Sequence, residues 1–122
     1  MAEEQIFDVG GIQLRVDHRT FGDDGGPAVR VFGDVGGEQV QVLRFDCFRK
    51  EPHYHYDPSG KDDKRDLDKD SVPDPISWTL EQLRHNLPEM VRTAGYGNLA
   101  QRIDVGAVKG TLCEVEDIMR TK

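Results

Sequence analysis

Cysteine is scarce in this sequence: a chain of 122 residues contains only Cys47 and Cys113, far apart. A chain of this length can form one hydrophobic core without disulfides or a structural metal. We therefore expect both cysteines to be free thiols, as in a reducing compartment. Cys47 falls in an apolar strand pattern, which predicts a small buried core residue.

Long apolar runs are also missing. No stretch approaches the ~20 apolar residues that a membrane-spanning helix needs. The chain begins Met-Ala-Glu-Glu-Gln, which is acidic and lacks the apolar segment of a secretory signal. These two absences predict a cytoplasmic protein that does not interact with membranes.

Positive charge is in short supply. The chain has 16 lysines and arginines against 23 aspartates and glutamates, a net charge of −7. A protein that binds nucleic acid should carry a basic patch, whereas the basic residues between positions 61 and 69 are interleaved with aspartates. We therefore expect no nucleic-acid partner. The net charge is compatible with a protein partner or with self-association.

What is present in residues 5–57 is the pattern of strands and turns. One parity of the first clear strand is apolar and the other polar, which predicts a half-buried strand; its apolar residues are Ile12, Leu14 and Val16. The sequence FGDDGGP at 21–27 predicts a loop, and residues 33–37 predict a hairpin turn.

The next strand changes its apolar parity between Val42 and Leu43, which predicts a β-bulge or a change of face. Pro52 then favours a sheet edge or a new strand for the segment that follows it. Residues 58–76 form a charged, proline-containing loop with almost no apolar anchor, for which we expect mobility.

Residues 77–122 predict helices. Thr79 and Gln82 have the spacing of a capping box, and Trp78 and Leu83 that of a hydrophobic staple. An apolar stripe follows, made of Leu80, Leu83, Leu87, Met90, Val91 and Ala94.

Pro88 should kink or split this helix, and Gly95 should end it. Two more capping boxes, Asn98 with Gln101 and Thr111 with Glu114, predict two shorter helices. The last of these turns a second apolar face inward, formed by Leu112, Val115, Ile118 and Met119.

The sequence thus predicts an α+β fold in a single domain, residues 1–122. An antiparallel sheet of about four to five strands (residues 5–57) packs with two to three helices (77–122), and the charged loop 58–76 joins them.

The densest group of chemically active residues is His53-Tyr54-His55-Tyr56-Asp57. In a strand, the two histidines share one face and the two tyrosines the other. Two imidazoles at this spacing can bind one divalent transition metal ion.

Asp57 has the same parity as the histidines and could add an oxygen ligand, and His18 is the best fourth candidate. His85 lies off the apolar stripe, and we expect it in solvent. The metallo-β-lactamase, histidine-triad and cupin patterns each fail at a ligand position, so none of them supports a catalytic assignment.

The same segment can instead be a binding surface, composed of His53, Tyr54, His55, Tyr56 and Trp78. Aromatic residues of this kind are enriched at interfaces. The alternative is that Tyr56 and Trp78 pack across the charged loop and join the two halves of the domain.

The runs LRFDCFRKEPHYHYDP (43–58) and DPISWTLEQLRHNLPEMVRTAGY (74–96) resemble a family of small bacterial proteins known only as a domain of unknown function. The resemblance implies a compact α+β domain and carries no catalytic residues.

The sequence therefore does not determine the function. The best hypothesis is a non-catalytic binding or protein-interaction domain that uses a sheet edge near residues 52–58, because the sequence shows no complete set of catalytic residues. The alternative is a metal-binding protein or metal-dependent enzyme that uses His53, His55 and Asp57.

Overall fold

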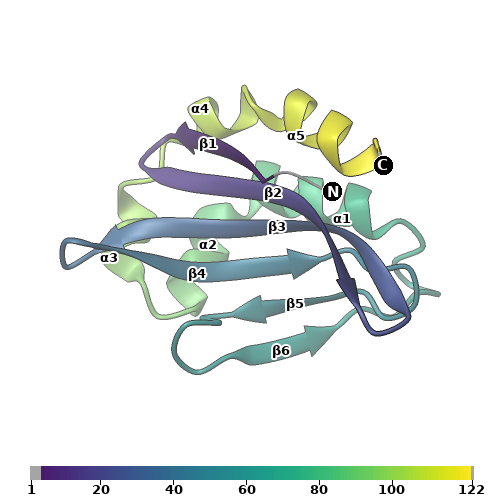
Figure 1. Ribbon diagram of the computed structural model, residues 1–122. Helices are drawn as coiled ribbons and strands as arrows, with labels where there is room; N and C mark the ends of the chain where they lie inside the picture. The colour runs from purple at the N-terminus through teal and green to yellow at the C-terminus, as the bar shows by residue number, and fades with distance from the viewer. Residues whose placement is uncertain (1–3, 122) are drawn as a thin grey trace.

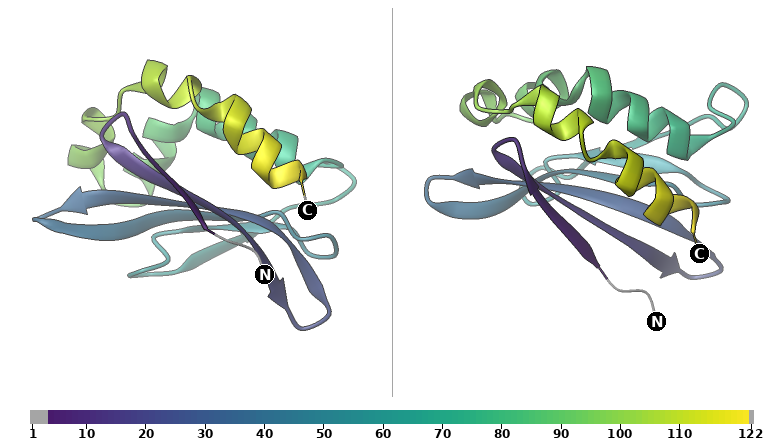
Figure 2. Two further views of the ribbon diagram at one scale, coloured as in Figure 1. Left: turned by 45° about the horizontal axis from the view of Figure 1, so that its top comes forward. Right: turned by 90° about the horizontal axis from the view of Figure 1, so that it is seen from above.

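The computed structural model describes residues 4–121 and shows an antiparallel sheet with helices packed against one face (Figures 1 and 2). The strands are β1 (Gln5–Val9), β2 (Ile12–Phe21), β3 (Asp24–Val35), β4 (Glu38–Asp46), β5 (His53–Tyr56) and β6 (Asp63–Asp66). The helices are α1 (Pro75–His85), α2 (Leu87–Thr93), α3 (Gly97–Gln101), α4 (Val105–Lys109) and α5 (Leu112–Arg120). The predicted α+β class is confirmed, with more strands and more, shorter helices than expected.

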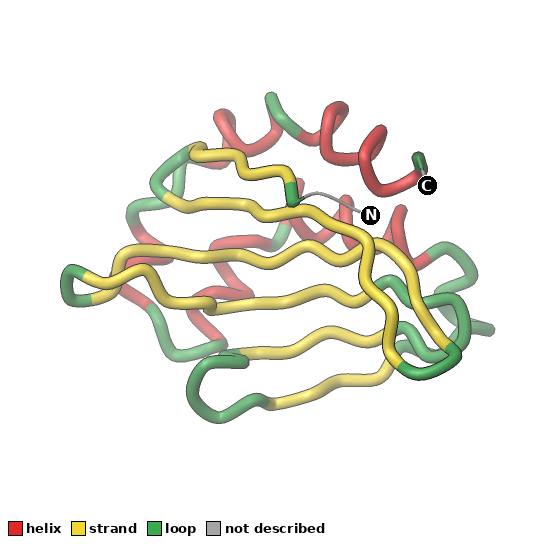
Figure 3. The backbone as a smooth tube through the Cα atoms, viewed as in Figure 1, coloured by secondary structure: helices red, strands yellow, loops and turns green. Residues whose placement is uncertain are grey.

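The strands follow one another across the sheet in chain order, β1 to β6, each antiparallel to the next (Figure 3). The loop predicted at 21–27 is instead mostly strand: Phe21 pairs with Asp24, so only Gly22 and Asp23 form the turn. The prediction was wrong because Gly25 and Gly26 were assigned to the turn, whereas they lie in β3. Their lack of a side chain lets a neighbouring backbone segment approach the strand closely. A Cβ on Gly26 would lie 2.3 Å from the carbonyl oxygen of Cys47.

The predicted bulge is confirmed. Val31 pairs with Leu43 and Phe32 with Gln41, which leaves Val42 as the extra residue in β4. Val42 and Leu43 are both fully buried, so the bulge places two consecutive apolar side chains in the core.

The charged loop is more ordered than predicted, because it contains β6, which pairs with β5 along its whole length. All four side chains of β6 are exposed, so the strand is held by backbone hydrogen bonds and gives no apolar signal. β6 also makes β5 an internal strand. Of the two alternatives predicted for the segment after Pro52, the new strand is confirmed and the sheet edge is wrong.

Helix α1 begins one turn earlier than predicted. The carboxylate of Asp74 accepts hydrogen bonds from the backbone N–H groups of Ile76 and Ser77, and Pro75 takes the first helical position. Thr79 is not a cap but a buried residue inside the helix. The apolar periodicity located the helix correctly, whereas the Thr79 capping box was a coincidence of spacing.

Pro88 separates α1 from α2, and Gly95 ends α2 with a φ of 105°, both as predicted. Asn98 lies inside α3 rather than at its cap, and α4, capped by the Asp104 side chain, was not predicted. Thr111 does precede α5, but its hydroxyl donates to the carbonyl of Val108 instead of capping the helix.

The core lies between the sheet and the helices and draws on both. Every residue of the predicted helical stripe is buried, as is Cys47. Trp78 packs against Tyr54, with ring centroids 5.0 Å apart, and against Phe45 at 6.2 Å. The other face of the sheet, which faces the viewer in Figure 1, carries no helix.

Candidate functional site

The open face of the sheet carries a row of basic residues that no stretch of the sequence shows. Register places Arg15 opposite Arg30, Arg30 opposite Arg44, Arg44 opposite His55, and His55 opposite Lys64. Like charges directly opposite each other oppose strand pairing. Neighbouring groups compensate: Arg30 pairs with Glu4, Arg44 with Asp46, and Arg15 stacks on Phe32.

One end of this row lies in a cavity of about 310 Å³, which we call the hairpin pocket. The β2–β3 hairpin bends out on the open side of the sheet (Figure 1) and provides one wall. The pocket is lined by Arg19, Thr20, Phe21, Arg44, Asp46, Phe48, His53, His55 and Lys64. Phe21 is 77% exposed, which is unusual for a residue of its size.

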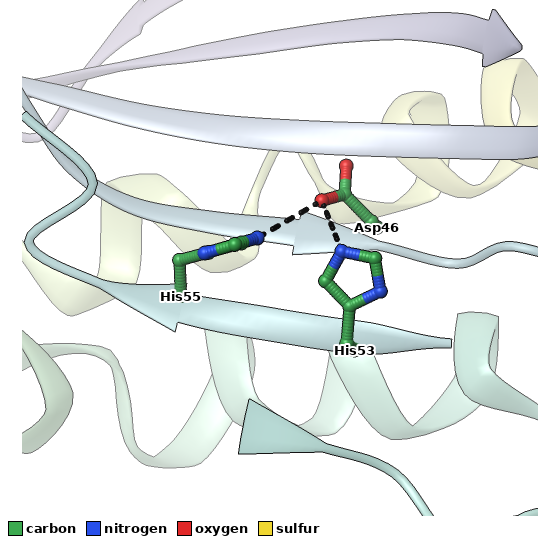
Figure 4. A group of neighbouring side chains, drawn as sticks. All are labelled: Asp46, His53 and His55. Atoms are coloured by element: carbon green, nitrogen blue, oxygen red, sulfur yellow. Dashed lines mark ion pairs between the residues drawn. The ribbon is translucent and has the colours of Figure 1, made fainter. Parts of the chain in front are cut away.

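Two histidines converge on one carboxylate inside the pocket (Figure 4). The Nε2 atom of His53 lies 2.9 Å from Asp46 Oδ2, and Nε2 of His55 lies 3.5 Å from the same oxygen. One ligand atom from each of these three residues falls within 4.8 Å of the others, so the group could hold a metal ion. Strand pairing creates this arrangement, because Asp46 on β4 is the register partner of His53 on β5.

The outer nitrogens of both histidines are anchored. Nδ1 of His53 lies 2.9 Å from the carbonyl oxygen of Glu51, and Nδ1 of His55 lies 2.7 Å from the carboxylate of Asp62. Both partners only accept hydrogen bonds, so each Nδ1 carries a proton. Such anchoring fixes the orientation of the ring and is typical of histidines that bind metals.

Arg44 gives the two histidines different hydrogen-bonding environments. Its Nη2 lies 2.8 Å from Nε2 of His55, and since guanidinium only donates, this contact favours the neutral form of His55. His53 instead faces acceptors at both nitrogens, Glu51 and Asp46, which favours its imidazolium form.

The pKa shifts follow the same contacts. The hydrogen bond to Asp46 raises the pKa of His53 above its ordinary value, against the opposing effect of burial. Burial and the charge of Arg44 lower the pKa of His55, although Asp62 acts in the opposite direction. Burial alone would raise the pKa of Asp46, but His53 and Arg44 together hold it below its usual range.

Two of the metal ligands predicted from the sequence lie elsewhere. Asp57 leaves the strand with a φ of 50° and accepts hydrogen bonds from the Tyr96 hydroxyl, at 2.5 Å, and from the backbone N–H of Lys61. His18 lies 3.2 Å from the carbonyl oxygen of Met119, at the end of α5. Asp46 therefore takes the place predicted for Asp57 beside the histidines.

The predicted binding surface is divided between the two faces of the sheet. His53 and His55 line the hairpin pocket, whereas Tyr54, Tyr56 and Trp78 pack against the core on the helical side. Trp78 does join the helices to the sheet, through Tyr54 rather than through Tyr56. His85 is exposed on α1, as predicted.

Asp46, Arg44, Arg19 and Lys64 were not identified from the sequence. Asp46 and Arg44 share the polar parity of an otherwise apolar strand, and this is the signal that could have placed them beside the histidines. Arg19 and Lys64 gave no comparable signal, because hairpin curvature and strand order bring them to the pocket.

A comparison with protein families matches residues 6–119 to the family described as Domain of unknown function (DUF7700). The chain belongs to this family. No curated protein and no solved structure matches the chain. Among residues 4–121, no helix is both long and apolar enough to cross a membrane.

Proposed function

We propose that this domain is a non-catalytic binding module that holds a small anion, with a carboxylate or phosphate group, in the hairpin pocket. The observation that carries the proposal is the charge of the lining. Arg19, Arg44 and Lys64 face a single carboxylate, Asp46, within an acidic chain of net charge −7. A partly enclosed pocket with excess positive charge concentrates anions.

The three cations are not equally engaged. Arg44 is held by Asp46 and His55, and Lys64 by an exposed ion pair with Asp66 at 3.3 Å. Arg19 forms no ion pair with any residue between 4 and 121. Its guanidinium is therefore available for a bidentate contact with a carboxylate or phosphate group.

Calorimetry with inorganic phosphate tests this proposal. We expect saturable binding to the wild-type protein and at least about tenfold weaker binding to Arg19→Gln, a loss of ~1.4 kcal/mol. Arg84→Gln is the matched control, because it removes the same charge from α1, outside the lining of the pocket. Equal binding by both variants, or none by the wild type, would overturn the proposal.

A divalent transition metal ion is the second candidate for the same pocket. It is favoured by the convergence of two anchored imidazoles on Asp46, whose other oxygen, Oδ1, is buried without a hydrogen-bond partner among the described residues. Three protein ligands would leave one coordination position open. Against it stands the guanidinium of Arg44, which already contacts both His55 and Asp46.

Zinc titration of the metal-free protein tests this candidate, with Co²⁺ absorption as a second readout. Stoichiometric binding that is lost in His53→Ala/His55→Ala and kept in His85→Ala would support it, since His85 is an exposed histidine on α1. Zinc binding that survives the double substitution would reject it.

Arg44→Met separates the two candidates, because they predict opposite effects. Removal of a cation that competes for His55 and Asp46 should strengthen zinc binding. The same removal should weaken phosphate binding, since a lining cation is lost.

A further inference from the structure

A second cavity lies where one end of the sheet meets the helices, at the end that holds the C-terminus in Figure 1. It has a volume of about 620 Å³, against about 310 Å³ for the hairpin pocket. Pockets that bury small organic ligands measure ~300–1,000 Å³. We call it the end cavity.

The wall of the end cavity is mostly apolar. Side chains from four separate parts of the chain contribute to it: Pro27, Phe48, Pro75, Ile76 and Met119. An apolar wall of this kind favours a ligand with a hydrocarbon or aromatic body, because burial of apolar surface stabilises the complex.

The polar groups around this wall are predominantly cationic. Arg19, Arg49 and Lys69 line the cavity and form no ion pair with any residue between 4 and 121; Arg19 also lines the hairpin pocket, so only Arg49 and Lys69 belong to the end cavity alone. Asp74 is the lining carboxylate, and its oxygens are already used by the start of α1 and by Arg120, at 3.1 Å. The unsatisfied charge at the cavity is therefore positive.

The Cys47 thiol in the wall of the end cavity is not suited to form a covalent bond with a ligand. Burial raises the pKa of Cys47 to about 12, and its sulfur lies 3.2 Å from the Thr79 hydroxyl. Because the reactive form of cysteine is the thiolate, Cys47 serves as an inert part of the wall.

We propose that the end cavity binds an amphipathic carboxylate, such as a medium-chain fatty acid, with its apolar body against Phe48, Ile76 and Met119. Arg49 and Lys69 hold the carboxylate. The end cavity adjoins the hairpin pocket, and the two linings share Arg19, Thr20 and Phe48. The two sites differ in chemistry, because only the end cavity has the apolar wall formed by Pro75, Ile76 and Met119.

Calorimetry with decanoate, decylamine and decanol, each below its micelle concentration, tests the proposal. The three probes have the same chain and differ in head-group charge. We expect saturable decanoate binding, weaker decanol binding and no decylamine binding. No binding of decanoate, or equal affinity for decanoate and decylamine, would overturn the proposal.

Two variants locate the site. Ile76→Trp should block decanoate by filling the cavity, and Arg49→Glu/Lys69→Glu should weaken it at least about tenfold while admitting decylamine. Arg84→Glu/Lys109→Glu is the matched control, with the same change of charge away from the cavity lining, and should bind decanoate like the wild type. Unchanged decanoate affinity in both cavity variants would place binding elsewhere and overturn the proposal.

Phosphate titration of the same samples separates this site from the hairpin pocket. Phosphate binding that persists in Ile76→Trp shows that loss of decanoate is local to the end cavity. Failure of phosphate binding in the wild type would reject the anion proposal and leave the decanoate result unaffected.

Discussion

His53 and His55 show how the pKa values of two neighbouring imidazoles on one strand are shifted in opposite directions. Their rings lie 5.0 Å apart and both approach Asp46, yet only His55 accepts a hydrogen bond from a guanidinium. Burial and the charge of Arg44 together lower the pKa of His55, whereas the hydrogen bond to Asp46 raises the pKa of His53. A single substitution at either histidine should therefore affect stability in opposite senses as pH changes.

The pKa of His53 is raised above its ordinary value of 6.5 on folding. The stability that it contributes is fully present below pH 6.5 and is lost as pH rises through the raised folded-state pKa. We expect His53→Gln to be less stable than the wild type at pH 5 to 6, with the gap narrowing toward pH 8. Urea denaturation at several pH values measures this gap, and a gap that widens with pH would contradict the assignment.

The pKa of His55 is lowered from the same ordinary value, so the unfolded chain takes up the proton first as pH falls below 6.5. This histidine therefore reduces stability on acidification. We expect His55→Gln to lose less stability between pH 7 and pH 5 than the wild type does. His85→Gln is the control for the loss of one histidine, because His85 is an exposed residue on α1, outside the hairpin pocket.

Among the elements, the turn between β1 and β2 positions α4. The carbonyl of Gly10 accepts a hydrogen bond from the backbone N–H of Asp104 at 2.8 Å. This approach leaves no room for a side chain, since a Cβ on Gly10 would lie 2.6 Å from the carbonyl oxygen of Asp104. The first hairpin and the cap of α4 therefore depend on one another.

Gly10→Ala tests this dependence, with Gly36→Ala as its control. Both glycines have a left-handed φ, 59° and 63°, so alanine should cost each variant ~1–2 kcal/mol of unfolding free energy. A Cβ on Gly36 meets nothing within 4 Å. Gly10→Ala should lose a further ~1–3 kcal/mol from the overlap with Asp104. Equal losses of unfolding free energy in the two variants, measured by thermal or chemical unfolding, would contradict the close contact between Gly10 and Asp104.

At the scale of the whole molecule, the helices cover one face of the sheet, and the join between the two layers runs through Cys47. The Cys47 sulfur contacts the Thr79 hydroxyl and lies 3.5 Å from the carbonyl oxygen of Pro75, both in α1. Because Cys47 also lines the end cavity, a reagent too large to enter that cavity reaches the sulfur only when α1 separates from β4. Cys47 should therefore report on opening of the layers.

Thiol labelling with a coloured disulfide reagent that is too bulky for the end cavity measures this opening. Cys113 is exposed and should react at once in the native protein. Cys47, buried and with its pKa raised to about 12, should react only at the rate of global unfolding. Cys113→Ser isolates the slow reaction. Fast labelling of Cys47 in that variant would show that the layers open locally.

The sequence by itself determined the elements whose apolar spacing is regular. The alternation through Val16, the bulge at Val42 and the helical stripe from Leu80 to Ala94 were all predicted correctly. Each such pattern is local, because burial of one face imposes a period of two or of 3.6 on the residues that form it. β6 was missed for the same reason, since four exposed side chains carry no such period.

Only the tertiary structure decided which residues share a site. Sequence spacing identified His53 and His55 but chose Asp57 as their partner, whereas strand register supplies Asp46 and Arg44. Residues on β2, β4, β5 and β6 meet at the hairpin pocket because strand order and hairpin curvature place them there. Neither property leaves a local pattern: register is fixed by backbone pairing between separate strands, so a cation on each strand becomes a basic row only once the sheet has formed.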